Sequence, residues 1–169
     1  EMALKDGKFS KAIEYFNIAI EKDPNWAPLY AGLGSAWLTY LHMGYASPSV
    51  ATPKIYENLN KALELDPDLP DAHGLSAMVA QLMEWDWYKS EKEFLKTLAI
   101  NPNDAITRIF YAQYLCTMQR TEEALRQGQL AYKLDALNPM MKSWYGAVLV
   151  MVGDCETALS LAEEVLVSD

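Results

Sequence analysis

The stretch NKALELDPDLPDAHGLSA, Asn60 to Ala77, has the pattern of one helix that ends and a second that begins. The pair Asp66–Pro67 stops the first helix, because a residue that precedes proline avoids helical backbone geometry. Closely similar stretches recur along the chain, beginning at Asn17, Leu95 and Gly128. Their turns are spaced by 43, 35 and 34 residues, at Pro24, Pro67, Pro102 and, in place of a fourth proline, Ala136.

The helix before each turn, which we call a B helix, carries small or apolar residues at offsets of four and three. These offsets place each set on one helix face, which predicts the side that is buried. The sets are Ala12, Phe16, Ala19; Ile55, Leu59, Ala62; Ser90, Phe94, Thr97; Ala124, Gly128, Ala131; and Ala158, Ala162, Val165.

The helix after each turn, the A helix, has a residue pair followed by a third residue. The sets are Leu33, Gly34, Trp37; Ser76, Ala77, Ala80; Tyr111, Ala112, Leu115; and Tyr145, Gly146, Leu149. A glycine or alanine at the second position suits two helix backbones that cross closely, since a larger side chain would force them apart. Helix starts are predicted at Thr52–Pro53 and Asn138–Pro139, where a capping residue precedes a proline suited to the first helical position.

Paired antiparallel helices with a period of about 34 residues are typical of a solenoid. The chain resembles the tetratricopeptide-repeat family in the motifs Tyr30-x2-Leu33-Gly34-x2-Trp37 and Ala12-x3-Phe16-x2-Ala19-x4-Pro24. The resemblance covers essentially the whole chain and implies an all-α, right-handed superhelical solenoid of antiparallel helix pairs. Single repeats depart from the family pattern at Arg108, Gly128, Ala136 and Lys142.

We expect residues 1–169 to form a single solenoid fragment. Its divisions are 1–26, a partial repeat; 27–69, a repeat with an insertion near 42–50; 70–104; 105–138; and 139–169, the last repeat, without a cap. Met2–Asp6 are expected to end an A helix, with the turn at Gly7. The insertion, HMGYASPSV, is predicted to be a loop because of its Gly, Ser and Pro. It is either a tolerated surface insertion or a contact loop with Tyr45 as its anchor.

The last B helix, TALSLAEEVLV (Thr157–Val167), is apolar on more than one face. Solenoid ends need a polar capping surface for solubility, so we expect possible self-association through uncapped ends.

Composition restricts the function. A net charge of −9 argues against a nucleic-acid partner or an anionic membrane surface. The longest apolar run, Trp144–Val152, is too short to cross a bilayer, and no signal peptide is visible. The two cysteines, Cys116 and Cys155, have no CxxC spacing, which suits a reducing compartment and favours, weakly, a cytoplasmic location.

No catalytic motif and no cofactor or metal site is predicted. The chain lacks GxxxxGK[ST], HExxH and GxSxG, and its carboxylates are scattered along helix faces. His73 falls where the repeat places an aromatic residue, so packing is its preferred interpretation. In Trp85-Asp86-Trp87, Trp87 is expected at a turn where an aromatic residue packs, with ligand stacking the less favoured alternative.

The family resemblance implies a concave groove lined by the A helices, where a peptide would bind. The stripe beside the core set consists of Ala31, Ser35, Leu38, Gly74, Met78, Gln81, Ile109, Gln113, Cys116, Ser143, Ala147 and Val150. It contains no lysine or arginine, so a basic clamp for a C-terminal carboxylate is not expected. Small, neutral and apolar side chains suit an apolar or neutral peptide or helix, with Gln81 and Gln113 able to bond its backbone. Alternatively, Leu38 and Val150 pack against a neighbouring repeat.

These observations predict a protein–protein interaction scaffold that is not an enzyme and binds another protein or peptide. The alternative is a regulatory or ligand-sensing segment of a larger bacterial signalling protein, such as a cyclase, a kinase or a transcription regulator. That alternative comes from a finer resemblance of YENLNKALELDPDLPDAHG and MEWDWYKSEKEFLKTLAINPND to the repeat regions of such proteins.

Overall fold

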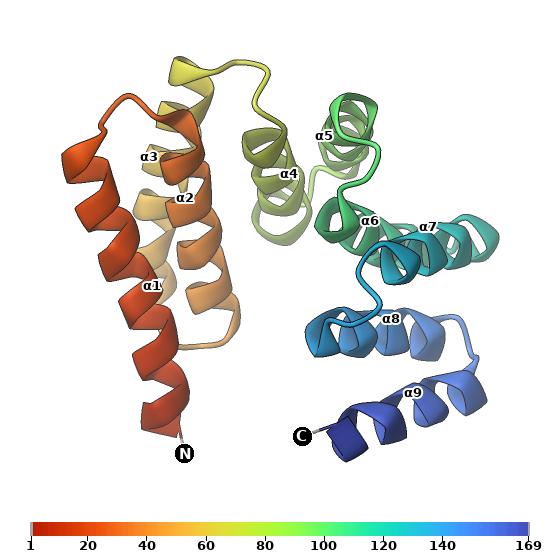
Figure 1. Ribbon diagram of the computed structural model, residues 1–169. Helices are drawn as coiled ribbons and strands as arrows, with labels where there is room; N and C mark the ends of the chain where they lie inside the picture. The colour runs from red at the N-terminus through yellow and green to blue at the C-terminus, as the bar shows by residue number, and fades with distance from the viewer. Residues whose placement is uncertain (1, 169) are drawn as a thin grey trace. The chain divides into compact units, whose positions relative to one another are not determined.

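The computed structural model describes the backbone of residues 2–168 and the side chains of residues 10–166 (Figure 1). Within this range the chain is all-α and has nine α-helices and one π-helical turn. They are α1 (Met2–Lys22), α2 (Ala27–His42), α3 (Pro48–Leu65), α4 (Pro70–Val79), η1 (Ala80–Glu84), α5 (Trp87–Ile100), α6 (Ala105–Thr117), α7 (Thr121–Leu134), α8 (Pro139–Met151) and α9 (Cys155–Ser168). The all-α prediction is confirmed, with A helices α2, α4, α6 and α8.

The chain divides into two compact units, Glu1–Glu84 (unit 1) and Trp85–Asp169 (unit 2). In unit 1, α2 contacts α1, α3 and α4, and α4 also contacts α3. In unit 2, α6 contacts α5, α7 and α8, while α8 contacts α7 and α9. Each unit therefore shows the same local arrangement, in which one A helix packs on the preceding B and A helices.

A hydrogen bond repeats at the turns and explains one departure from the family pattern. Tyr30 donates its hydroxyl to the carbonyl of Pro24 at 2.9 Å, and His73 Nε2 donates to the carbonyl of Pro67 at 2.9 Å. Arg108 occupies the same place and donates Nε and Nη2 to the carbonyl oxygen of Pro102 at 2.9 and 2.6 Å. An aromatic ring is therefore not required at this position, because a donor of similar reach serves the same acceptor.

Some of the described helices begin at side-chain caps, whereas α2, α3, α4 and α7 begin without a side-chain cap bond. Asp86, Asp104 and Asn138 each accept a backbone N–H of the first turn of α5, α6 and α8 at 2.9–3.0 Å. The predicted start at Asn138–Pro139 is confirmed.

The predicted start at Thr52–Pro53 is wrong, because α3 begins at Pro48 after the extended Ser47, and Pro53 lies inside the helix. Ser47–Pro48 has the same cap-then-proline chemistry and occurs earlier in the chain. The loop between α2 and α3 therefore covers residues 43–47, shorter than the predicted 42–50.

The expected turn at Gly7 is also wrong, since α1 is continuous from Met2 to Lys22. Glycine costs a helix about 1 kcal/mol but does not end it without a further stop signal. A proline or an αL cap supplies such a signal at other helix ends, and none follows Gly7.

Gly34, at the second A-helix position of α2, and Gly128 of the B helix α7 mark close crossings. A Cβ built on Gly34 of α2 would lie 2.6 Å from Leu75 Cδ2 of α4, and Leu75 is buried. Gly128 of α7 is likewise approached by the ring of Tyr145 at 3.1 Å. The absence of a side chain at these two positions allows the next A helix to pack closely.

Each unit has its own apolar core. In unit 1 the core joins α2, α3 and α4 through Ala31, Leu38, Ile55, Leu59, Ala62, Leu75 and Val79. In unit 2 a core cluster joins α6 to α9 through Ile109, Ala112, Ala131, Met141, Tyr145, Val148, Leu149, Ala158 and Leu161. Most of the predicted core sets of the first four B helices are buried, as their spacing indicates.

Candidate functional site

The predicted groove residues divide by exposure. Ala31, Leu38 and Ile109 have exposed fractions of 1%, 3% and 0%, so they belong to the cores and present no surface. The alternative that Leu38 packs against a neighbouring repeat is the one that the structure shows. The remaining nine residues are half-buried or exposed and form what we call the A-helix stripe: Ser35, Gly74, Met78, Gln81, Gln113, Cys116, Ser143, Ala147 and Val150.

In unit 1 the A-helix stripe runs over α2 and α4, which contact each other. Ser35, Gly74 and Met78 are half-buried, and Met78 packs on the core cluster. Gln81 lies in η1, where the helix widens to a π-helical turn that shifts the register of the following side chains. The side chains of this part of the stripe are therefore uncharged, and the amide of Gln81 lies at its end.

In unit 2 the A-helix stripe runs over α6 and α8, which also contact each other. Gln113 is half-buried, while Ser143, Ala147 and Val150 are exposed, Val150 by 56%. Ser143 donates its hydroxyl to the carbonyl of Pro139 at 2.9 Å and so presents little free polarity. This part of the surface is thus also neutral, and more open than its counterpart in unit 1.

The thiol of Cys116 is set back in the surface of α6. Burial raises its pKa above the usual value, so the thiol is protonated at neutral pH. A protonated thiol is a poor nucleophile, which makes Cys116 a small apolar contact within the stripe.

A polar network joins α5, α6 and α7 in unit 2. Tyr111 donates its hydroxyl to Glu91 at 3.0 Å, and Glu91 also pairs with Arg120. Arg120 in turn forms a two-pronged ion pair with Glu123, in which both N–O distances are 2.7 Å. Burial and the Glu91 carboxylate raise the pKa of Tyr111 to about 12. The network fixes three helices and leaves Tyr111 uncharged below strongly alkaline pH.

Trp85 and Trp87 form an aromatic corner next to this network. Their rings meet edge to face with centroids 5.7 Å apart, and Trp87 also lies 6.4 Å from the ring of Tyr114. Trp87 is the first residue of α5, so the turn itself is Trp85–Asp86, and Trp85 has a positive φ of 57°. Trp87 packs as expected, although it lies one residue beyond the turn.

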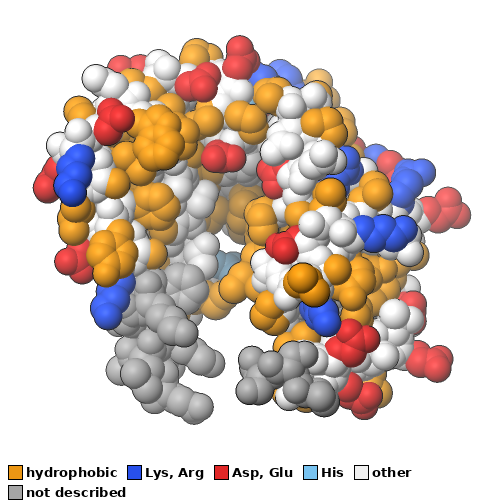
Figure 2. All heavy atoms as spheres, in the orientation of Figure 1, with side chains coloured by type: hydrophobic (Ala, Val, Ile, Leu, Met, Phe, Trp, Pro, Cys, Tyr) orange, Lys and Arg blue, Asp and Glu red, His pale blue; other side chains and the backbone are white. Residues whose placement is uncertain are grey.

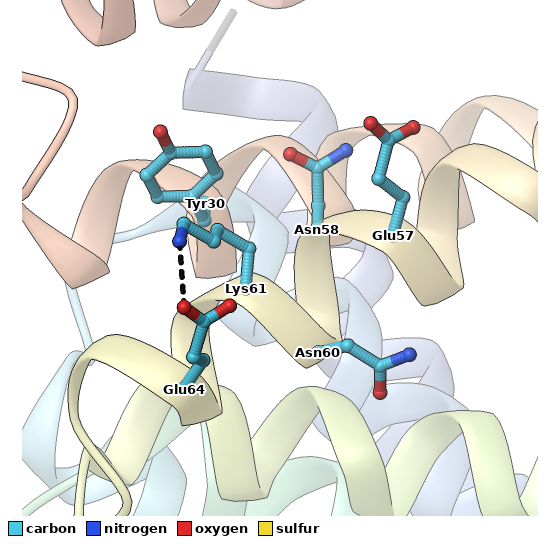
Figure 3. Close-up of a pocket in the computed structure, with 6 residues that line it drawn as sticks. All are labelled: Tyr30, Glu57, Asn58, Asn60, Lys61 and Glu64. Carbon is cyan, nitrogen blue, oxygen red and sulfur yellow. Dashed lines mark hydrogen bonds and ion pairs between the residues drawn. The ribbon is translucent and has the colours of Figure 1, made fainter.

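A polar hollow of about 500 Å³ lies on unit 1 between Tyr30 of α2 and the face of α3 (Figure 3). Lys61 pairs with Glu64 at 2.9 Å, and Asn58 donates to the carbonyl of Lys54 at 2.7 Å. Figure 3 shows Asn60 pointing away from this ion pair. Lys61 and Glu64 satisfy each other, Asn58 and Tyr30 bond backbone carbonyls, and Asn60 points away, so these side chains do not converge on a common point as catalytic groups would. The repeat pattern gives no signal for the hollow.

The loop over residues 43–47 is held against α2. The ring of Tyr45 lies 5.5 Å from the ring of Tyr40, and the amide of Tyr45 donates to the carbonyl of Tyr40 at 3.0 Å. Tyr45 is half-buried. These contacts favour the surface-insertion interpretation over the contact-loop interpretation.

Among the described residues, no helix combines the length and the apolar character needed to cross a membrane. The same residues include no group of three or more His, Cys, Asp or Glu side chains placed to hold a metal ion.

Solved structures match the chain. PilF of Pseudomonas aeruginosa is 29% identical with a TM-score of 0.63, and the match covers 83% of this chain but 60% of PilF. TTC0263, a tetratricopeptide-repeat protein of Thermus thermophilus, matches 98% of this chain and 85% of its own length, at 14% identity and a TM-score of 0.72. The fold is that of tetratricopeptide-repeat proteins.

YrrB, described as a tetratricopeptide-repeat protein with an unusual peptide-binding site, matches 98% of this chain and 80% of its own length, at 17% identity and a TM-score of 0.54. No family model and no curated protein sequence matches the chain. None of the matches described above supports the finer resemblance to bacterial signalling proteins. The fold prediction is confirmed by the helix pairs and by these structures together.

Proposed function

We propose that the chain is a protein–protein interaction scaffold that binds an apolar or neutral peptide or helix on the A-helix stripe, without catalysis. The observation that carries the proposal is the composition of that stripe. Its nine accessible residues carry no formal charge at neutral pH, although 37 of the 169 residues of the chain are charged. A face that excludes charge within an acidic protein suits an apolar or neutral ligand.

The geometry supports this proposal within each unit. In both, two contacting A helices present the stripe, so its side chains are held on packed elements and little ordering opposes binding. Gln81 and Gln113 supply an amide donor and acceptor at half-buried positions, which suits the backbone of an extended peptide. YrrB, which has this fold, is described as having an unusual peptide-binding site, and this supports a peptide-binding role. The free cysteines are consistent with the weaker proposal of a cytoplasmic location.

The test is a selection of linear peptides from a random display library on the purified chain, followed by titration of a selected peptide. Gln113→Lys in unit 2 and Met78→Glu in unit 1 should each be made separately. We expect at least one of them to weaken binding about tenfold or more, because each puts a charge into a neutral, partly desolvated contact.

Matched controls carry the same charge changes on B helices. Gln129→Lys on α7 and Leu95→Glu on α5 alter exposed side chains outside the A-helix stripe and should leave the affinity unchanged. Circular dichroism should show wild-type helicity in all four variants. Equal affinity of both stripe variants and the wild type would place the binding site elsewhere and refute this assignment.

A further inference from the structure

Trp85 has a backbone conformation that a large side chain rarely adopts. Its φ of 57° is positive, and the other positive-φ residues of the described chain follow the ends of α2, α6 and α8 as Gly44, Gln119 and Gly153. A positive φ brings the Cβ of an L residue close to the following carbonyl oxygen, which disfavours a bulky side chain. Glycine or glutamine serves this turn elsewhere in the chain, so the turn itself does not require a tryptophan.

The helical segment before Trp85 contains one residue more than its counterpart in α6. The positive-φ residue Gln119 comes seven residues after the second A-helix position, Ala112, whereas Trp85 comes eight residues after Ala77. The π-helical turn η1 takes up the additional residue, because a π turn bonds over five residues where an α turn bonds over four. Turns of this kind are frequent at functional sites, and this one leads directly into Trp85.

Packing does not account for Trp85 either. Its side chain is 69% exposed and meets the half-buried ring of Trp87 edge to face, while Tyr88, three residues further on, is 83% exposed. We call Trp85 and Tyr88 the aromatic face. Figure 2 shows hydrophobic side chains interspersed with acidic and basic ones, so exposure alone does not single out a site. Exposure together with a disfavoured backbone that no core contact requires does indicate a functional role.

The aromatic face offers two hydrogen-bond donors to an occupant. Among the described residues, neither the indole N–H of Trp85 nor the hydroxyl of Tyr88 has a hydrogen-bond partner. The indole N–H can only donate, so it requires an acceptor. An occupant therefore has to bring carbonyl or hydroxyl oxygens together with apolar surface for the two rings.

Charge favours a neutral occupant. Glu84 and Asp86 flank Trp85 in the sequence, while Lys89 and Lys92 follow Tyr88 on α5. Two carboxylates and two ammonium groups balance each other, so this segment attracts neither a cation nor an anion by net charge. The balance argues against a phosphate group and against an arginine stacked on the ring of Trp85.

The spacing of the two rings selects one neutral peptide conformation. Trp85 and Tyr88 are three residues apart in the chain, so their Cα atoms lie at most about 11 Å from each other. A polyproline II helix has three residues per turn and rises about 3.1 Å per residue, so prolines at i and i+3 recur every ~9 Å on one face. Such a helix makes no internal hydrogen bonds, which leaves its carbonyl oxygens available as acceptors, and aromatic surfaces bind its proline rings.

We propose that the aromatic face binds a proline-rich segment of a partner protein in the polyproline II conformation. Prolines at i and i+3 contact the rings of Trp85 and Tyr88, and carbonyl oxygens of the segment accept from the indole N–H and the phenol. This goes beyond the proposed function, because both residues lie outside the A-helix stripe, at the start of α5 in unit 2. The ligand also differs, since it is defined by proline spacing.

The test is a titration of the full chain with octaproline, followed through the indole N–H signals in proton–nitrogen NMR spectra. The signal of Trp85 is the one that is missing from Trp85→Gly, and we expect it to shift on binding. Trp85→Gly and Tyr88→Ala should each weaken binding about tenfold or more, because each removes one of two aromatic anchors. An octapeptide of alternating proline and glycine has no prolines at i and i+3 and should bind at least about tenfold more weakly than octaproline.

Two matched controls separate the rings from their surroundings. Gln119→Gly makes the same change to glycine at the other positive-φ residue of unit 2 that is not glycine, and it should leave the affinity unchanged. Trp26→Ala removes another exposed tryptophan and should also leave it unchanged, which excludes unspecific stacking. Thermal unfolding checks that the variants are folded, and Tyr88→Ala, a change at an exposed residue, keeps the test decisive if Trp85→Gly is not folded.

Three results would overturn the proposal: no shift of the Trp85 signal with octaproline, equal binding of the two peptides, or binding that survives both Trp85→Gly and Tyr88→Ala. A neutral oligosaccharide such as maltohexaose that shifts the Trp85 signal when octaproline does not would also overturn it and make a sugar the occupant. None of these results bears on the stripe variants Met78→Glu and Gln113→Lys, which are tested with a different peptide.

Discussion

Replacing each of two equivalent helix glycines by alanine should move stability in opposite directions or by clearly different amounts. In a helix interior, alanine is favoured over glycine by about 1 kcal/mol. At Gly146 nothing opposes this gain, because no atom lies within 4 Å of the added Cβ, so Gly146→Ala should stabilise the protein by up to about 1 kcal/mol.

At Gly34 the added methyl would meet Leu75 Cδ2 at 2.6 Å. Leu75 is 2% exposed and packed in the core of unit 1, so it cannot turn away without displacing its neighbours. Overpacking of this kind costs about 1–3 kcal/mol, which offsets or exceeds the helix gain. Gly34→Ala should therefore lie about 1–3 kcal/mol below Gly146→Ala in free energy of unfolding.

Urea unfolding of the two variants and the wild type, followed by far-ultraviolet circular dichroism, measures this difference. Backbone propensity alone would give both variants the same gain, so that gain drops out of the difference between the two variants, and the wild type is the common reference. If Gly34→Ala proves as stable as Gly146→Ala, or more so, the close α2–α4 crossing described above is refuted.

Three further predictions concern unit 2. Because the folded pKa of Tyr111 is raised to about 12 from 10.0, its stabilising contribution is complete below pH 10 and is lost as pH rises towards 12; this loss should reach about 2–3 kcal/mol in urea titrations. Tyr111→Phe should lose less stability than the wild type over this pH range, although Tyr114 and Tyr145, whose pKa values are also raised, still titrate in it. Phe94→Ala should destabilise by about 3–5 kcal/mol, since Phe94 has an exposed fraction of 0%, whereas Tyr88→Ala on the same helix, at 83%, should change the free energy by less than about 0.5 kcal/mol. Asp104→Ala removes the cap that accepts the amide of Thr107 at 3.0 Å and should cost about 1 kcal/mol in the same assay, so an unchanged midpoint would mean that this cap is not formed in solution.

The helix pairs could be predicted because three signals depend on local backbone geometry: the repeat period, the prolines that end helices, and the small residues at helix crossings. Local geometry is determined by residues that are close together in the sequence. The start of α3 could not be predicted, since Ser47–Pro48 and Thr52–Pro53 are both a capping residue followed by a proline. Packing of Ala51 and Ile55 in the core determines which of the two begins the helix.

The groove was the less predictable part. Helical spacing places Ala31 and Ser35 on the same stripe, but Ala31 is buried and Ser35 is only half-buried, because burial depends on how far the following A helix reaches. The first and last residues of the predicted groove set are buried in α2 (Ala31, Leu38) and half-buried in α4 (Gly74, Gln81), while in α6 Ile109 is buried and Cys116 is half-buried. The exposed fraction of equivalent residues thus differs from one repeat to the next, although the residue pattern is the same. The pattern of a single repeat therefore cannot predict which groove residues are accessible.

The bond from the A helices α2, α4 and α6 to the carbonyl of the preceding turn proline bears on how such repeats are recognised. Phenol, imidazole and guanidinium groups serve one acceptor at Tyr30, His73 and Arg108. At this position we expect natural variants to keep a hydrogen-bond donor on a side chain of similar length. An aromatic ring is not required. A sequence profile that scores a hydrogen-bond donor six residues after the proline would detect degenerate repeats. A profile that scores residue identity alone would miss them.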